Sequence, residues 1–270
     1  MPARPAARPG GHTSSDGLLG FIVIAWATTW LLSLPLVASR ISGAPVQPYM
    51  VAMAGMSAFG PTFAAFAMAH RRGGIGSIFV RSRASLWWLP VALLTPFALH
   101  LGAKLLEVAF GGTIERWIWL PQASAQVAAL FVFPVGEEIG WRGFAHARLM
   151  QRFGPVLGPL LTGLIWGIWH LFYVITPSGD IEFLRFGLML LELMCWGLIV
   201  AWFFERTQRS LSVAIAIHAG AHLDNSAQIP MDAWRLNALM LLILAVAALF
   251  AARALQKASA PTLRNSVRAI

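Results

Sequence analysis

Residues 18–38, LLGFIVIAWATTWLLSLPLVA, form an apolar run without a single charged side chain. A helix of about 20 such residues spans the hydrocarbon core of a bilayer. No small-residue cleavage site follows, so we expect a retained span and not a signal peptide. The whole chain is similar in character: 58% of its 270 residues are hydrophobic, 11% are charged, and the mean hydropathy is +0.68. Soluble domains carry roughly 25% charged residues, so the sequence predicts an all-α, polytopic membrane protein.

Further apolar runs of similar length predict eight transmembrane helices in total. No long polar linker divides them, so we expect one membrane domain over residues 18–255. A tail over residues 1–17, rich in Pro, Ala and Gly, is expected to be disordered, and a basic tail covers residues 256–270. The predicted spans are 18–38, 49–69, 86–110, 123–148, 156–175, 184–204, 211–229 and 236–255.

Basic residues are distributed unevenly between the loops. The chain has 20 Lys and Arg against 11 Asp and Glu, a net charge of +9. If the runs alternate across the membrane, about fourteen basic residues fall on the side of both termini and about four on the other. We therefore expect both termini in the cytoplasm and the protein in the plasma membrane. Basic residues in such short loops orient a membrane protein, which excludes nucleic acid as the partner.

The densest group of charges inside a predicted span is GEEIGWRGFAHARL, residues 136–149. Charged groups near the bilayer centre are costly and are by default candidates for function. Glu138 and Arg142 are four residues apart and can pair on one helix face, which leaves Glu137 about 100° away. Two adjacent carboxylates repel, which favours Glu137 as a proton acceptor. Alternatively, all three form one ion-pair network that joins helices.

Two further clusters of polar residues follow on later spans. In WGIWH, Trp166 and His170 share a helix face, although a lone histidine in an apolar helix is commonly a packing residue. In IAIHAGAHLDNS, residues 215–226, His218 and His222 are four apart and could bind one metal ion or hold one substrate oxygen. Alternatively, they form a satisfied polar patch beside a loop. Three clusters on three spans together favour an intramembrane reaction centre.

Small residues accompany these clusters. Gly136 and Gly140 flank the two glutamates, and Gly158, Gly163 and Gly167 precede His170. Small residues let neighbouring helix backbones approach closely in a membrane. We therefore expect the fourth and fifth spans to pack together and to bring Glu137 towards His170. The only cysteine, Cys195, excludes an intramolecular disulfide, a zinc ribbon and an iron–sulfur centre.

In this order, the clusters resemble the CPBP family, which comprises the type II CAAX prenyl proteases and their bacterial relatives in bacteriocin processing and self-immunity, the Abi proteins. The family pattern is EExxxR, then an aromatic residue ahead of a histidine, then HxxxN. Here EExxxR starts at Glu137, the second motif runs from Trp166 to His170, and His218 starts the third. The resemblance covers roughly residues 85–230 and implies an eight-helix membrane domain with a conical intramembrane active-site cavity.

The resemblance also implies roles for individual residues. Glu137 would be the general base with His170 as its partner, and His218 with His222 would donate to the oxyanion. Glu138 is counted with these catalytic residues, and Arg142 and Trp166 would give structural support. The chain departs from the family at His222, which stands where the family has Asn. A histidine can donate a hydrogen bond from a ring nitrogen, so His222 could replace the amide. Asn225 could do so only if the helix end unwinds.

Cofactor and function leave alternatives open. Family members are described either as zinc metalloproteases or as metal-free glutamate proteases, and Glu137, His170 and His218 would suffice as zinc ligands. We expect an intramembrane endopeptidase whose partners are membrane-associated, lipidated or apolar peptides and the lipid bilayer itself. The alternatives are a catalytically inactive scaffold or immunity protein of the same fold, and a proton-coupled transporter. A transporter would be expected to show inverted halves, and no such repeat is evident.

Overall fold

The computed structural model describes residues 17–70, 74–79, 82–115, 117, 124–175, 177–223 and 233–267. Within these residues the chain is helical throughout and contains no strand. The predicted tail over residues 1–17 lies outside the described part, apart from Gly17. The α-helices are α1 (Leu18–Ser42), α2 (Pro48–Met56), α3 (Gly60–His70), α4 (Trp88–Ala109), α5 (Ser124–Gly140), α6 (Ala147–Trp169), α7 (Phe183–Arg206), α8 (Leu211–Leu223) and α9 (Trp234–Val267).

Four shorter helical segments join these elements. The 3₁₀ segments are η1 (Ser57–Phe59), η2 (Ile75–Ile78) and η4 (Leu171–Val174), and η3 (Trp141–His146) is a π-helix that connects α5 directly to α6. The fourth predicted span therefore does not stop at residue 148. The chain instead bends inside α6 at Gly154, whose φ of 81° is open to glycine and which precedes Pro155. At the other end of the chain, α9 continues into the predicted basic tail as far as Val267.

Among the described residues, five helical segments are long and apolar enough to cross a membrane. They coincide with the first, second, third, sixth and eighth predicted spans. The fourth and fifth predictions fall on α5, η3 and α6, and the seventh falls on α8, an apolar helix of 13 residues. The protein is therefore an all-helical, multi-pass membrane protein. The segments that carry the candidate site are the ones that hydropathy marks less clearly, because charged and polar side chains interrupt them.

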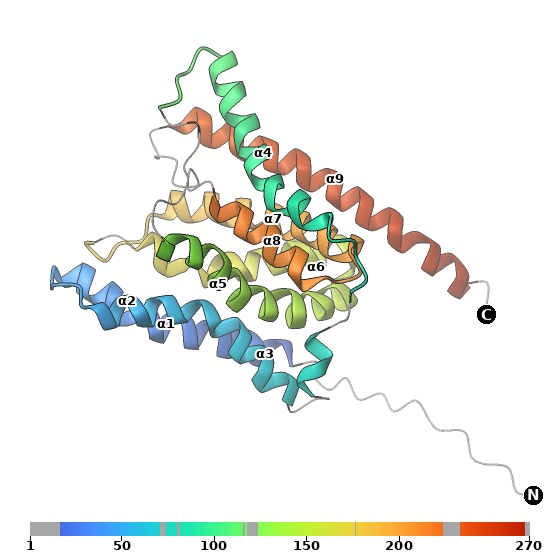
Figure 1. Cartoon of the computed structure of the whole chain (residues 1–270), viewed down its shortest axis with the longest axis horizontal. Coiled ribbons are helices and arrows are strands. Elements are labelled where there is room, and N and C mark those ends of the chain that lie inside the picture. Colours follow the sequence, from blue (N-terminus) through green and yellow to red (C-terminus); the bar gives the residue numbers. More distant parts are fainter. Residues whose placement is uncertain are drawn as a thin grey trace, which may run out of the picture.

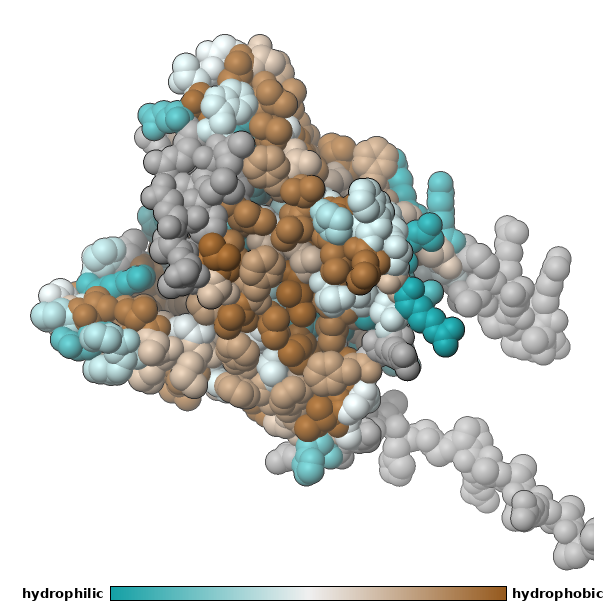
Figure 2. Space-filling view, in the orientation of Figure 1, coloured by the Kyte–Doolittle hydropathy of each residue, from teal (hydrophilic) through white to brown (hydrophobic). Residues whose placement is uncertain are grey.

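The helices are arranged in three groups. Helices α1, α2 and α3 pack together on one side, α5 to α8 form the middle, and α4 and α9 lie on the opposite side (Figure 1). Helix α8 lies in contact with both α4 and α5, and α7 packs against α6 and α9. Apolar residues cover much of the surface shown in Figure 2, as expected for helices that face lipid.

Glycines decide which helices approach most closely. A Cβ atom at Gly163 of α6 would collide with the backbone of α7 at Leu193, and one at Gly140 of α5 would collide with Pro61 of α3. The prediction of close helix packing at these glycines is confirmed. Their partners differ from the prediction: α6 approaches α7 and α5 approaches α3, so the fourth and fifth spans are not packed on each other through these residues.

Candidate active site

The predicted site residues come from four neighbouring elements. Glu137 and Glu138 lie in the last turn of α5, Arg142 in η3, Trp166 near the end of α6, and His218 in α8. A π-helical turn is wider than an α-helical one, and such turns occur frequently at functional sites. Here η3 is almost completely buried and carries Arg142 into the bundle.

Glu138 is the centre of a buried charge network. Its Oε1 atom accepts hydrogen bonds from Arg142 Nη1 at 2.7 Å and from His218 Nδ1 at 2.8 Å. The predicted pairing of Glu138 with Arg142 along one helix face is confirmed. The bond to His218 joins residues 80 positions apart and links α5 to α8. A buried carboxylate needs such partners, because an unpaired charge in an apolar interior is very costly.

Glu137 has different surroundings from its neighbour. Its Oε2 accepts a hydrogen bond from Trp166 Nε1 at 2.7 Å, and it takes no part in an ion pair within the described residues. Glu138 has no exposed surface, whereas Glu137 keeps an exposed fraction of 4%. The two glutamates are therefore separated as predicted: Glu138 pairs with Arg142, and Glu137 does not.

The indole of Trp166 contacts every other part of the site. Besides its bond to Glu137, the ring lies 5.0 Å from the guanidinium carbon of Arg142, in cation–π geometry. Its centroid is 5.7 Å from that of His170 and 5.1 Å from that of His218, both edge to face. Trp166 therefore sets the spacing between the carboxylate and the two imidazoles.

His170 occupies the end of α6 and is partly buried. Its Nδ1 lies 2.9 Å from the carbonyl oxygen of Trp166, an oxygen that can only accept, so Nδ1 carries the proton. In the neutral ring Nε2 is then an acceptor. No hydrogen bond joins His170 to Glu137 in the described part of the chain; Trp166 lies between them.

The third motif is only partly enclosed. The rings of His218 and His222 stack with centroids 5.0 Å apart and an interplanar angle of 24°, as their spacing of four residues predicts. His218 is buried, whereas His222 is exposed. Asn225, considered above as a substitute for the family's Asn, lies outside the described residues.

A zinc site would need three or four ligand atoms that converge on one point. Within the described residues, no three His, Cys, Asp or Glu side chains are grouped closely enough to hold a metal ion. Nδ1 of His170 and Nδ1 of His218 are each occupied by a hydrogen bond. These bonds leave Nε2 of each ring as the atom that would bind zinc. Zinc binding stays a prediction, and the mechanism proposed below does not pass through zinc.

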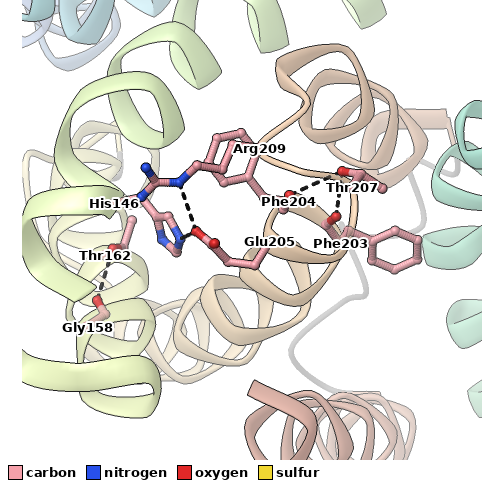
Figure 3. Close-up of polar contacts among 8 residues, drawn as sticks. All are labelled: His146, Gly158, Thr162, Phe203, Phe204, Glu205, Thr207 and Arg209. Atoms are coloured by element: carbon pink, nitrogen blue, oxygen red, sulfur yellow. Dashed lines mark hydrogen bonds and ion pairs between the residues drawn. The ribbon is translucent and has the colours of Figure 1, made fainter. Parts of the chain in front are cut away.

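A second polar cluster, which the motifs did not reveal, adjoins the site at the far end of η3. His146 Nε2 lies 3.1 Å from Glu205 Oε1, and Arg209 Nε donates to the same oxygen at 3.3 Å (Figure 3). His146 is buried and its ring meets the edge of Phe204. This cluster anchors the end of the π-helix to α7. Nothing in the sequence pairs His146 with a residue 59 positions away, so only the fold could reveal it.

Fold and site together define a helical membrane protein with a buried Glu–Arg–His network beside a second buried glutamate that is bonded to an indole. Residues 119–223, which include all three motifs, match the family described as Type II CAAX prenyl endopeptidase Rce1-like. The chain is also 28% identical to CAAX prenyl protease 2 of Methanococcus maripaludis over 157 residues, which are 53% of this chain and 58% of that relative. These matches confirm the resemblance to the CPBP family that the three motifs predicted.

Proposed function

We propose that the chain is an intramembrane endopeptidase that hydrolyses peptide bonds of membrane-associated, lipidated or apolar substrates. The family match and the relative's name support a protease. The observation that carries the proposal is the different surroundings of the two adjacent glutamates. Glu138 accepts hydrogen bonds from Arg142 and His218, whereas the buried carboxylate of Glu137 accepts one from Trp166 and forms no ion pair with a described residue.

In the proposed reaction, Glu137 removes a proton from a water molecule while the water oxygen attacks the scissile carbonyl carbon. The carbonyl oxygen becomes an oxyanion in a tetrahedral intermediate. When the C–N bond breaks, Glu137 returns the proton to the leaving amine. General-base catalysis of this kind contributes roughly 10²- to 10⁴-fold to the rate. Nε2 of His170, an acceptor in the neutral ring, orients the attacking water from the other side of Trp166.

The oxyanion would be held by His218 and His222. Because the ionised carboxylate of Glu138 can only accept, Nδ1 of His218 is the donor in the bond between His218 and Glu138. His218 can then donate from Nε2 to an oxyanion only when both ring nitrogens carry protons. Glu138 thus supports the reaction in two ways: it holds the ring of His218 in place, and its negative charge stabilises the positive charge of the doubly protonated ring. His222, stacked on that ring, would provide the second donor.

The placement in the membrane is part of the same proposal. The eight predicted spans would form the eight crossings, with both termini in the cytoplasm and a conical cavity that admits substrate and water to Glu137. The plasma membrane is the proposed location. The many apolar side chains on the outer surface, together with the apolar helices, support placement in a bilayer.

The test is cleavage by the purified protein in lipid nanodiscs, read by mass spectrometry, on a mixed library of prenylated, apolar and unmodified peptides. The Glu137→Gln variant serves as the blank. Cleavage by the wild type alone would support the proposal, and the cut sites would define the substrate class. If folded wild-type protein and the blank leave the whole library equally intact, the protease proposal fails. The inactive scaffold or immunity protein, which the His222 departure favours, would replace it.

A further inference from the structure

A cavity of about 600 Å³ lies away from the candidate site, between the start of α6, the end of α7 and residues 254–259 of α9. Pockets for small ligands commonly have volumes of roughly 300–1,000 Å³. The lining includes the cations Arg206 and Lys257 and the apolar side chains of Met150, Trp202 and Leu255, and it is completed by Glu205, Ala254, Ala258 and Ser259.

The two cations have no partner in the described part of the chain. Arg206 and Lys257 are both exposed, and neither side chain forms a hydrogen bond or ion pair with a described residue. The acidic residue at the cavity, Glu205, is bonded to His146 and Arg209 (Figure 3). The negative charge of Glu205 is therefore paired with residues outside the cavity, and the positive charges of Arg206 and Lys257 remain in excess there.

The apolar wall argues for an amphiphilic ligand. Leu255 is buried, and Trp202 and Met150 are partly buried, so they form an apolar surface directly beside the cations. A soluble anion such as phosphate would use only the cations. A phospholipid would place its acyl chain on the wall and its phosphate on Arg206 and Lys257. Basic pockets between membrane helices are known to hold anionic headgroups.

The position of the cavity fits this ligand. It lies where the segments Phe183–Arg206 and Trp234–Ser259, both apolar enough to cross a membrane, come to their ends. Hydrophilic residues gather near the C-terminal end of α9 on the surface shown in Figure 2. In the proposed topology this end lies on the side with the larger share of Arg and Lys, which faces the anionic leaflet.

We propose that the cavity between α6, α7 and α9 binds the phosphate-bearing headgroup of an anionic phospholipid through Arg206 and Lys257. This site is separate from the cluster around Glu137. It depends on the helical membrane fold and not on the proposed protease activity, so its failure would leave that proposal intact, and the reverse also holds.

Native mass spectrometry of the full-length protein, released from nanodiscs of phosphatidylcholine with one-fifth phosphatidylglycerol, tests the site. We expect phosphatidylglycerol to be retained in preference to phosphatidylcholine. Replacement of one surface cation typically weakens anionic lipid binding about fivefold. Arg206→Gln and Lys257→Gln should each show a loss of this size, and Arg206→Lys should retain most of the binding.

The matched control is Arg253→Gln, which removes an exposed cation of α9 that does not line the cavity. An equal loss in this control would show that general surface charge, and not this cavity, holds the lipid, and would overturn the proposal. Equal retention of the two lipids by the wild type would also overturn it. Soluble glycerol 1-phosphate provides a last arm: if it competes as well as the intact lipid, the ligand is a free anion and the lipid assignment is wrong.

Discussion

Glu137 and Glu138 are adjacent and chemically identical, yet their carboxylates have different hydrogen-bond partners in the structure. Glu138 lies between two donors, Arg142 and His218, whereas Glu137 accepts one bond from a neutral indole. Glu137→Gln keeps the shape and a carbonyl oxygen for Trp166 but removes the base. We expect cleavage to fall by about 10²-fold or more, with an unchanged melting temperature.

Glu192→Gln is the matched control for this variant, because Glu192 is an intramembrane carboxyl group on α7 that contributes nothing to the site described here. It should retain full cleavage. Both rates can be measured on one peptide in nanodiscs, with thermal unfolding recorded in parallel. Full turnover by Glu137→Gln would show that another group activates the water.

His222 is the residue at which the chain departs from the family's motif, and its replacement tests whether a donor is required there. Loss of one oxyanion donor typically costs 10²- to 10³-fold in kcat. We therefore expect His222→Ala to lose about that much, while His222→Asn, which restores the family's amide, keeps most of the rate. If the Ala and Asn variants have the same kcat, the proposed donor role of position 222 is wrong.

At the scale of the elements, Arg142 connects the π-helix to its neighbours. It pairs with Glu138 at 2.7 Å and lies over the ring of Trp166, and both charged side chains are almost fully buried. Removal of one partner from a buried pair costs about 3–5 kcal/mol, because the other charge remains buried. Arg142→Ala should therefore unfold at a clearly lower denaturant concentration than the wild type.

The double variant Arg142→Met with Glu138→Gln is the control for this prediction. It removes both charges at similar volume and should be more stable than Arg142→Ala, although inactive. Chemical unfolding in detergent micelles, followed by tryptophan fluorescence, compares the three proteins. If Arg142→Ala unfolded at the wild-type midpoint, the network would have no structural role.

The α6–α7 contact depends on a missing side chain at Gly163. Its Cβ position is occupied by the backbone of α7, and overpacking of this kind costs roughly 1–3 kcal/mol. Gly163→Ala should lower the melting temperature. Gly187→Ala, in α7, is the control, because nothing lies within 4 Å of its Cβ position. Equal melting temperatures for the two variants would contradict the packing described here.

At the scale of the whole molecule, the proposed eight crossings make a prediction about labelling in intact cells. In a Cys195→Ala background, single cysteines at Glu115 and Ser178 should react with a membrane-impermeant maleimide from outside. Cysteines at Ser85 and Gln208 should react only after permeabilisation. Labelling of all four positions from one side would rule out the proposed alternation of the spans.

The class of the protein, a helical membrane protein, could be predicted from the sequence because each helix is determined by a short local stretch of residues. A run of about 20 apolar residues must satisfy its backbone hydrogen bonds internally in lipid, so hydropathy alone predicts helices. The pair Glu138–Arg142 and the stack His218–His222 could be predicted for the same reason, because residues four apart share a helix face. The three motifs were sufficient to predict the resemblance to the CPBP family, which the comparisons confirm.

Only the tertiary structure decided how these local units combine. The bond from Glu138 to His218, the bond from Trp166 to Glu137 and the cluster of His146 with Glu205 join residues 29 to 80 positions apart. The glycines predicted that helices would pack closely but could not name the partners, and α6 packs on α7 instead of α5. Helix periodicity determines which face of one helix is polar. Which face of another helix it meets depends on the packing of the whole bundle, which no local pattern encodes.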